Sequence, residues 1–92
     1  MRIGIPAETR AGETRVAATP ETVKKLATKH QVVVQAGAGV AASVIDDAYV
    51  AAGATIGSAA DAFGCDVVLK VRAPDANERA LMKPGAVLIG ML

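Results

Sequence analysis

The feature that most limits the fold of this chain is a regular alternation between short apolar runs and charged or amphipathic segments. The apolar runs cover residues 2–6, 32–34, 54–56, 66–71 and 86–92. Runs of this length, bounded by turn residues, are typical of strands. Because strands that alternate with helices form parallel sheets, we expect an α/β fold with a parallel sheet and flanking helices.

The clearest helix signal begins at Thr19. Pro20 and Glu21 follow it, so an N-cap oxygen, a preset φ angle and a negative charge meet at the start of one helix. Apolar residues then recur at helical spacing from Val23 to His30. We therefore expect His30 on the apolar side of this helix, near its end, with a carbonyl group or the helix dipole as its partner.

Three shorter helices follow with weaker signals. Asp46 is expected to cap a helix that ends before Gly53, its C′ residue. Ser58 is expected to cap another that stops at Gly64, and residues 77–82 form the last. This sequence of elements places each helix between two strands.

Composition excludes several classes of function. The 92 residues allow one modest domain, and their net charge of +1 comes from interspersed acidic and basic residues, so a nucleic-acid surface is not expected. Cys65 is the only cysteine, which excludes an internal disulfide and favours a reducing compartment. No apolar run approaches the roughly 20 residues of a membrane span. The first residues also lack a signal-peptide core, so we expect a cytosolic chain without membrane insertion.

The last apolar run, residues 86–92, has no helix after it to cover it. A central strand of this kind is normally buried on both faces. We therefore expect either further sequence or a partner to cover it, and interpret the chain as the opening stretch of an incomplete domain.

Arg15 and Lys70 are the candidate binding residues. Arg15 lies in the charged connection after the first strand, at the sheet edge where parallel α/β folds bind ligands, and could clamp a carboxylate or phosphate. It could equally be a solvated arginine paired with Glu8 or Glu13. Lys70 lies within the apolar run 66–71, where an ammonium needs a partner and could serve as an anion clamp. The alternative is a strand with a wet face that carries Lys70 and Arg72.

Three other features favour structural interpretations. Residues 37–42 read GAGVAA and fit a dinucleotide fingerprint superficially, but no long helix opens there and the acidic residue at suitable distance, Asp61, falls in a predicted helix. A glycine turn is the preferred interpretation. His30 lacks a second ligand at metal-binding spacing. Cys65 is interpreted as a small buried hydrophobe.

Five segments resemble the alanine dehydrogenase and nicotinamide nucleotide transhydrogenase family. They are MRIGIP at 1–6, ETRVAATP at 13–20, QAGAG at 35–39, AAGA at 51–54 and VLKVRAP at 68–74. They occur in the family's order over nearly the whole chain. The RVAATP and LKVRAP segments are more similar to the transhydrogenase branch than to the alanine dehydrogenase branch.

The resemblance implies a Rossmann-like amino-terminal domain, residues 1–92, in a subunit whose second, nucleotide-binding domain is absent here. The parent would transfer hydride between NAD(H) and NADP(H), coupled to proton translocation, with a membrane-embedded partner subunit and as a homodimer. It would be cytoplasmic and peripheral to the inner membrane. NAD and NADP are therefore cofactors of the parent, and neither is expected on this chain, which we expect to be inactive alone.

Two alternatives remain. In the alanine dehydrogenase branch, residues matching Arg15 and Lys70 bind the carboxylate and carbonyl oxygen of pyruvate, although the histidine that works beside them would lie beyond Leu92. In a transhydrogenase the pair has no keto acid to bind. A non-enzymatic association module, with the last strand covered by another chain, is the second alternative.

Overall fold

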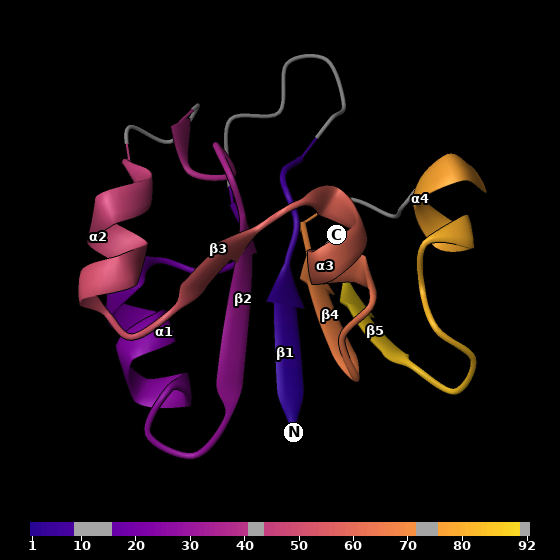
Figure 1. The fold of residues 1–92 in the computed structure, drawn as a ribbon, viewed down its shortest axis with the longest axis horizontal. Helices are drawn as coiled ribbons and strands as arrows, with labels where there is room; N and C mark the ends of the chain where they lie inside the picture. The colour runs from indigo at the N-terminus through magenta and orange to yellow at the C-terminus, as the bar shows by residue number, and fades with distance from the viewer. Residues whose placement is uncertain (9–15, 41–43, 72–75, 91–92) are drawn as a thin grey trace.

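Five short strands form one parallel sheet, in the order β3-β2-β1-β4-β5 (Figure 1). A computed structural model describes residues 1–8, 16–40, 44–71 and 76–90. The strands are β1 (Arg2–Ile5), β2 (Gln31–Gln35), β3 (Thr55–Gly57), β4 (Val67–Lys70) and β5 (Val87–Gly90). The helices are α1 (Pro20–Leu26), α2 (Asp46–Ala51), α3 (Ala59–Phe63) and α4 (Ala76–Ala80). The predicted parallel α/β fold is confirmed, because all four strand pairings are parallel.

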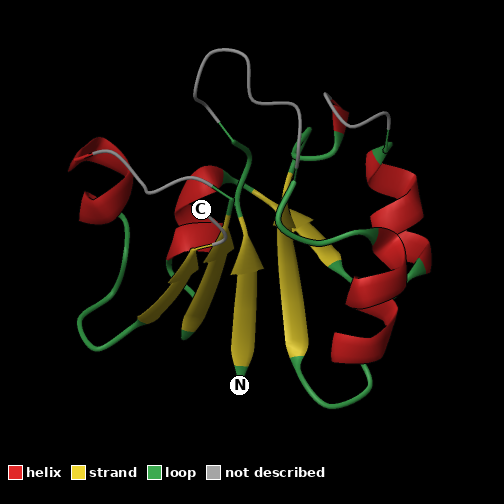
Figure 2. Cartoon of the chain, turned by 180° about the vertical axis from the view of Figure 1, so that it is seen from behind, coloured by secondary structure: helices red, strands yellow, loops and turns green. Residues whose placement is uncertain are grey.

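The sheet has a topological switch point between β1 and β4. From β1 the chain adds β2 and then β3 on one side, and then returns to place β4 and β5 on the other. The connections that leave β1 and β4 therefore run in opposite directions, as Figure 2 shows from behind. In open parallel sheets, this crevice at the carboxyl ends of the strands is where ligands bind.

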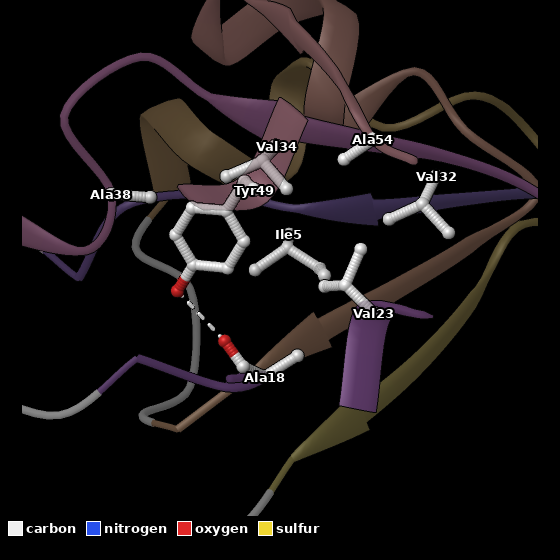
Figure 3. Close-up of a cluster of buried hydrophobic side chains, with 8 residues drawn as sticks. All are labelled: Ile5, Ala18, Val23, Val32, Val34, Ala38, Tyr49 and Ala54. Atoms are coloured by element: carbon white, nitrogen blue, oxygen red, sulfur yellow. Dashed lines mark hydrogen bonds between the residues drawn. The ribbon is translucent and has the colours of Figure 1, made fainter. Parts of the chain in front are cut away.

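One face of the sheet carries the main apolar core, which α1 and α2 cover (Figure 3). Its buried members are Ile5, Ala18, Val23, Val32, Val34, Ala38, Tyr49 and Ala54. Tyr49 brings a hydroxyl into this core and donates it to the Ala18 carbonyl at 2.8 Å. Burial raises the pKa of Tyr49, and the Asp46 carboxylate adds to the shift. The core is built mainly of small aliphatic side chains, as the composition requires.

The opposite face is covered by α3, which packs directly on the backbone of β1. An ideal Cβ at Gly4 would lie 1.8 Å from the Ala62 carbonyl oxygen. Because successive strand residues point to opposite faces, Gly4 faces α3 while Ile5 faces the main core. Ala62 and Phe63 of α3 are buried here. The close approach depends on the missing side chain of Gly4.

The helix-end signals were confirmed at three positions. Thr19 accepts from the Thr22 amide as N-cap of α1, and Ser58 and Asp61 form a reciprocal capping box on α3. The Ser58 backbone and side-chain hydrogen bonds lower the pKa of Asp61. Gly53, with a φ of 103°, follows the C-cap of α2 as predicted. Local chemistry alone sets these ends.

Two helix predictions were wrong. Ile45, and not Asp46, is the N-cap of α2, because the Asp46 carboxylate accepts the Gly37 amide at 2.9 Å instead. The helix α1 ends at Leu26, so His30 lies beyond it, and only the His30 backbone amide bonds the Leu26 carbonyl, at 3.0 Å. The Nδ1 atom of His30 is buried and has no hydrogen-bond partner within the described part of the chain.

The glycine segment 36–39 is a turn, as predicted, and Gly37 has a φ of 79°. At Gly39 an ideal Cβ would lie 2.7 Å from the Val44 carbonyl oxygen and 2.9 Å from a ring carbon of Tyr49. Close packing therefore accounts for this glycine. Asp61 lies in α3, where it caps the helix.

The edge strand β5 is apolar but exposed. Val87, Leu88 and Ile89 are 53 %, 39 % and 49 % exposed. Its four residues pair with β4 through the ladder from Val67↔Val87 to Lys70↔Gly90. Among the described helices, none has the length and apolar character needed to cross a bilayer.

Candidate functional site

The switch point brings together the end of β4 and the segment that follows β1. Lys70 is the last residue of β4, and Glu8 lies three residues after the end of β1. The Lys70 Nζ atom lies 3.2 Å from Glu8 Oε1, although the two residues are far apart in sequence. Parallel strands direct their carboxyl ends to the same edge, so the strand order alone makes these groups neighbours.

Lys70 is enclosed by acceptors. Its side chain is 1 % exposed and that of Glu8 is 2 % exposed. Glu78 Oε2, on α4, lies 3.7 Å from Nζ, and the Ala7 carbonyl lies 3.5 Å from it. An ammonium carries three donors, and three acceptors of this chain surround it. The interpretation of β4 as a strand with a wet face at Lys70 is therefore wrong.

Glu8 also holds the backbone of β4. Its Oε2 accepts the Val71 amide at 3.0 Å, while Oε1 faces the Lys70 ammonium. One carboxylate thus receives a charged donor and a backbone donor from adjacent residues. Charge-assisted hydrogen bonds of this kind are stronger than neutral ones.

The segment between β1 and Glu8 is attached to β2 as well. The Ala7 amide donates to Gln35 Oε1 at 2.8 Å, and Gln35 is the last residue of β2. Residues 6–8 are therefore held between the carboxyl ends of β2 and β4. This arrangement gives the switch point a defined floor of backbone and charged side chains.

The opposite edge of the sheet carries a second charged group, which is exposed. Asp66 accepts the Arg2 amide at 2.9 Å and also binds the Lys83 ammonium. The hydrogen bond from Lys83 lowers the pKa of Asp66, and the Arg2 amide contributes further. Because both partners are solvated, this pair is a surface feature of the kind that contributes little.

Cys65 is buried, as predicted, and its thiol lies 3.3 Å from the Asp61 carbonyl, which accepts it. Burial raises the pKa of this thiol. The thiol is therefore disfavoured as a nucleophile. Within the described ranges, no group of three His, Cys, Asp or Glu side chains could hold a metal ion.

Of the two predicted binding residues, the structure describes only Lys70. Arg15 and Arg72 lie outside the described residues. Sequence reasoning mentioned Glu8 only as a partner for Arg15 and did not consider Glu78. A signal for Glu8 was present, because it follows a strand that ends in a parallel sheet, where functional side chains gather.

These features define an α/β domain with a Rossmann-like parallel sheet and a charged switch point. Residues 4–92 match the family described as "Alanine dehydrogenase/PNT, N-terminal domain". The chain belongs to this family.

Individual relatives come from both branches of the family. The chain is 54 % identical to an NAD(P) transhydrogenase alpha subunit of Rhodospirillum rubrum, over 97 % of this chain and 25 % of that protein. It is 43 % identical to an alanine dehydrogenase of Bilophila wadsworthia, over 96 % of this chain and 24 % of that protein. A transhydrogenase crystal structure from Sinorhizobium meliloti matches with a TM-score of 0.95 and 44 % identity, over 100 % of this chain and 27 % of that one. The chain thus spans about a quarter of the length of these relatives.

Proposed function

We propose that this chain is the amino-terminal portion of the alpha subunit of a proton-translocating NAD(P) transhydrogenase. The observation that carries the proposal is the order of similarity. Identity is 54 % to the transhydrogenase subunit and 43 % to the alanine dehydrogenase, over nearly the same span. The parent would be an oxidoreductase that passes hydride between NAD(H) and NADP(H).

The state of Lys70 supports this proposal. A keto-acid site needs a cation that is available to the ligand, whereas Lys70 Nζ faces Glu8 at 3.2 Å and Glu78 at 3.7 Å. In a transhydrogenase no keto acid has to be bound. Lys70 can then serve to join the segments that border the switch point.

Cofactors and partners would belong to the whole protein. NAD and NADP would bind to the parent complex, with the dinucleotide fingerprint in a second domain of the same subunit. The remainder of the alpha subunit and a membrane-embedded subunit would be the partners, and the alpha subunit would be a homodimer. The assembly would lie on the cytoplasmic side of the inner membrane, with this domain peripheral to it.

An alanine dehydrogenase is the second candidate function, and the position of Lys70 favours it. Lys70 ends β4 at the switch point, where a substrate carbonyl would be expected. In that function Lys70 would bind the carbonyl oxygen of pyruvate and Arg15 its carboxylate.

Segment exchange separates the two candidates. The matching segment of the R. rubrum alpha subunit is replaced by this chain, and the same replacement is made in the B. wadsworthia dehydrogenase. We expect reduction of an NAD analogue by NADPH in the first chimera. We expect little pyruvate-dependent and ammonium-dependent NADH oxidation in the second.

The unexchanged parents are the controls, and the oligomeric state of each chimera is compared with that of its parent. A correctly assembled dehydrogenase chimera that is active, beside a correctly assembled transhydrogenase chimera that is not, contradicts the proposal. In that case Lys70→Met should remove pyruvate binding from the active chimera.

The exposed apolar residues of β5 favour a third possibility, an association module. Val87, Leu88 and Ile89 are each more than a third exposed, and an edge strand of this kind can pair with another chain. If this strand mediates self-association, sedimentation velocity at increasing concentration should show a dimer, and Leu88→Lys should restore the monomer. A monomer at every concentration contradicts self-association through β5.

A further inference from the structure

The Glu8 carboxylate divides its two oxygens between two groups at the end of β4. One oxygen faces the Lys70 ammonium at 3.2 Å, and the other accepts the Val71 amide at 3.0 Å. Both side chains of the ion pair are almost fully buried. Desolvating a carboxylate and an ammonium is costly unless their geometry is well matched. A buried pair is therefore better explained by what it positions than by the stability it adds.

Lys70 needs such a partner to have a defined orientation. A lysine side chain has four rotatable bonds and loses about 2 kcal/mol of rotamer entropy when it is fixed. The Ala7 carbonyl at 3.5 Å and Glu78 at 3.7 Å are long contacts, whereas the Glu8 contact is shorter. Among the contacts that define the ammonium position, the one to Glu8 is thus expected to dominate.

Glu8 is itself held in place by its neighbours in the chain. Ile5 is fully buried in the main core, and Pro6 restricts the backbone directly after it. The Ala7 amide is bound by Gln35 of β2. The Glu8 side chain therefore starts from a fixed backbone and reaches across the switch point to β4.

We propose that Glu8 is a positioning residue, whose carboxylate fixes the Lys70 ammonium at the switch point and joins the segment after β1 to the end of β4. Glu78 is a secondary partner that brings α4 to the same ammonium. All three side chains belong to the described part of the chain, so this role holds whether the parent is a transhydrogenase or a dehydrogenase.

The test uses NMR on the full chain and follows two signals. A buried, paired lysine ammonium exchanges its protons slowly and gives an observable N–H signal, whereas solvated lysines do not. Lys70→Arg, which removes this signal, assigns it. The second signal is hydrogen exchange of the Val71 amide, which reports on the other oxygen of Glu8.

Glu8→Gln separates the two roles of the carboxylate. The variant keeps an oxygen for the Val71 amide and removes the charge that faces Lys70. We expect the Lys70 signal to disappear, while Val71 exchange changes by less than about threefold, on the order of a few tenths of a kcal/mol. In Glu8→Ala both are lost, and Val71 exchange should accelerate about tenfold or more, the size expected for a charge-assisted hydrogen bond.

Three further variants make the test specific. Glu21→Gln is the same chemical change at an exposed position of α1 and should alter neither signal. Glu78→Gln should preserve the Lys70 signal, and Glu8→Asp should retain it in part because the charge remains. The proposal is overturned if the Lys70 signal survives in Glu8→Gln or disappears in Glu78→Gln. If Glu8→Gln does not fold, Glu8→Asp and Glu78→Gln still decide between the two carboxylates.

Discussion

Replacing Lys70 by methionine should lower the free energy of unfolding by about 3 kcal/mol or more. Methionine fills most of the volume of the lysine stem but removes the ammonium. Glu8 and Glu78 would lose the cation that they share, and the Glu8 carboxylate is almost fully buried. Breaking a buried ion pair from one side costs about 3 to 5 kcal/mol, because the other charge stays desolvated. Urea unfolding followed by circular dichroism measures the change.

The matched control removes both charges together. In the double variant Glu8→Gln, Lys70→Met, no carboxylate remains opposite the missing ammonium, although Gln can still accept the Val71 amide. We expect this variant to be more stable than Lys70→Met alone, since replacing a whole buried pair is often nearly neutral. If the two single changes instead add in the double variant, the pair is not energetically coupled.

Gly4→Ala is the second change with a large expected effect, about 3 kcal/mol of lost stability. The new Cβ would lie 1.8 Å from the carbonyl oxygen of Ala62 and 2.7 Å from its carbonyl carbon. Both atoms belong to backbone, so α3 would have to move away from the sheet. Overpacking of a close-packed interior typically costs about 1 to 3 kcal/mol, and this contact is at the severe end.

Gly90→Ala provides the comparison on the same face of the sheet. Gly90 pairs with Lys70 in the ladder between β4 and β5, and an added Cβ meets nothing within 4 Å. Because glycine weakens a strand by about 0.5 to 1 kcal/mol relative to alanine, we expect this change to be neutral or slightly stabilising. Equal losses at Gly4 and Gly90 would show that contact with α3 does not explain the first result.

Much of the fold follows from local sequence patterns. The apolar runs placed all five strands, and Thr19, Ser58 and Gly53 marked helix ends correctly. These signals work because they depend on hydrogen bonds and φ angles within a few residues. Asp46 failed as a cap because its carboxylate had a partner nine residues away, the Gly37 amide, which a local pattern does not reveal.

The candidate site was predicted in part. The position of Lys70 at the end of an apolar strand indicated the sheet edge on which it lies, but two interpretations of its environment remained open. Burial and the contact with Glu8 decided between them. The role of Glu8 was missed, because choosing it over other acidic residues requires knowing which strands are neighbours.

The sequence by itself determined the alternation of strands and helices, the parallel sheet and the edge on which Lys70 lies. Only the tertiary structure decided that β4 lies beside β1, and so that Glu8 and Lys70 meet. The physical reason is that periodicity and capping are local, whereas strand order depends on how the whole chain buries its apolar faces. The same reason explains Gly4, whose missing side chain gains its meaning only when α3 packs against it.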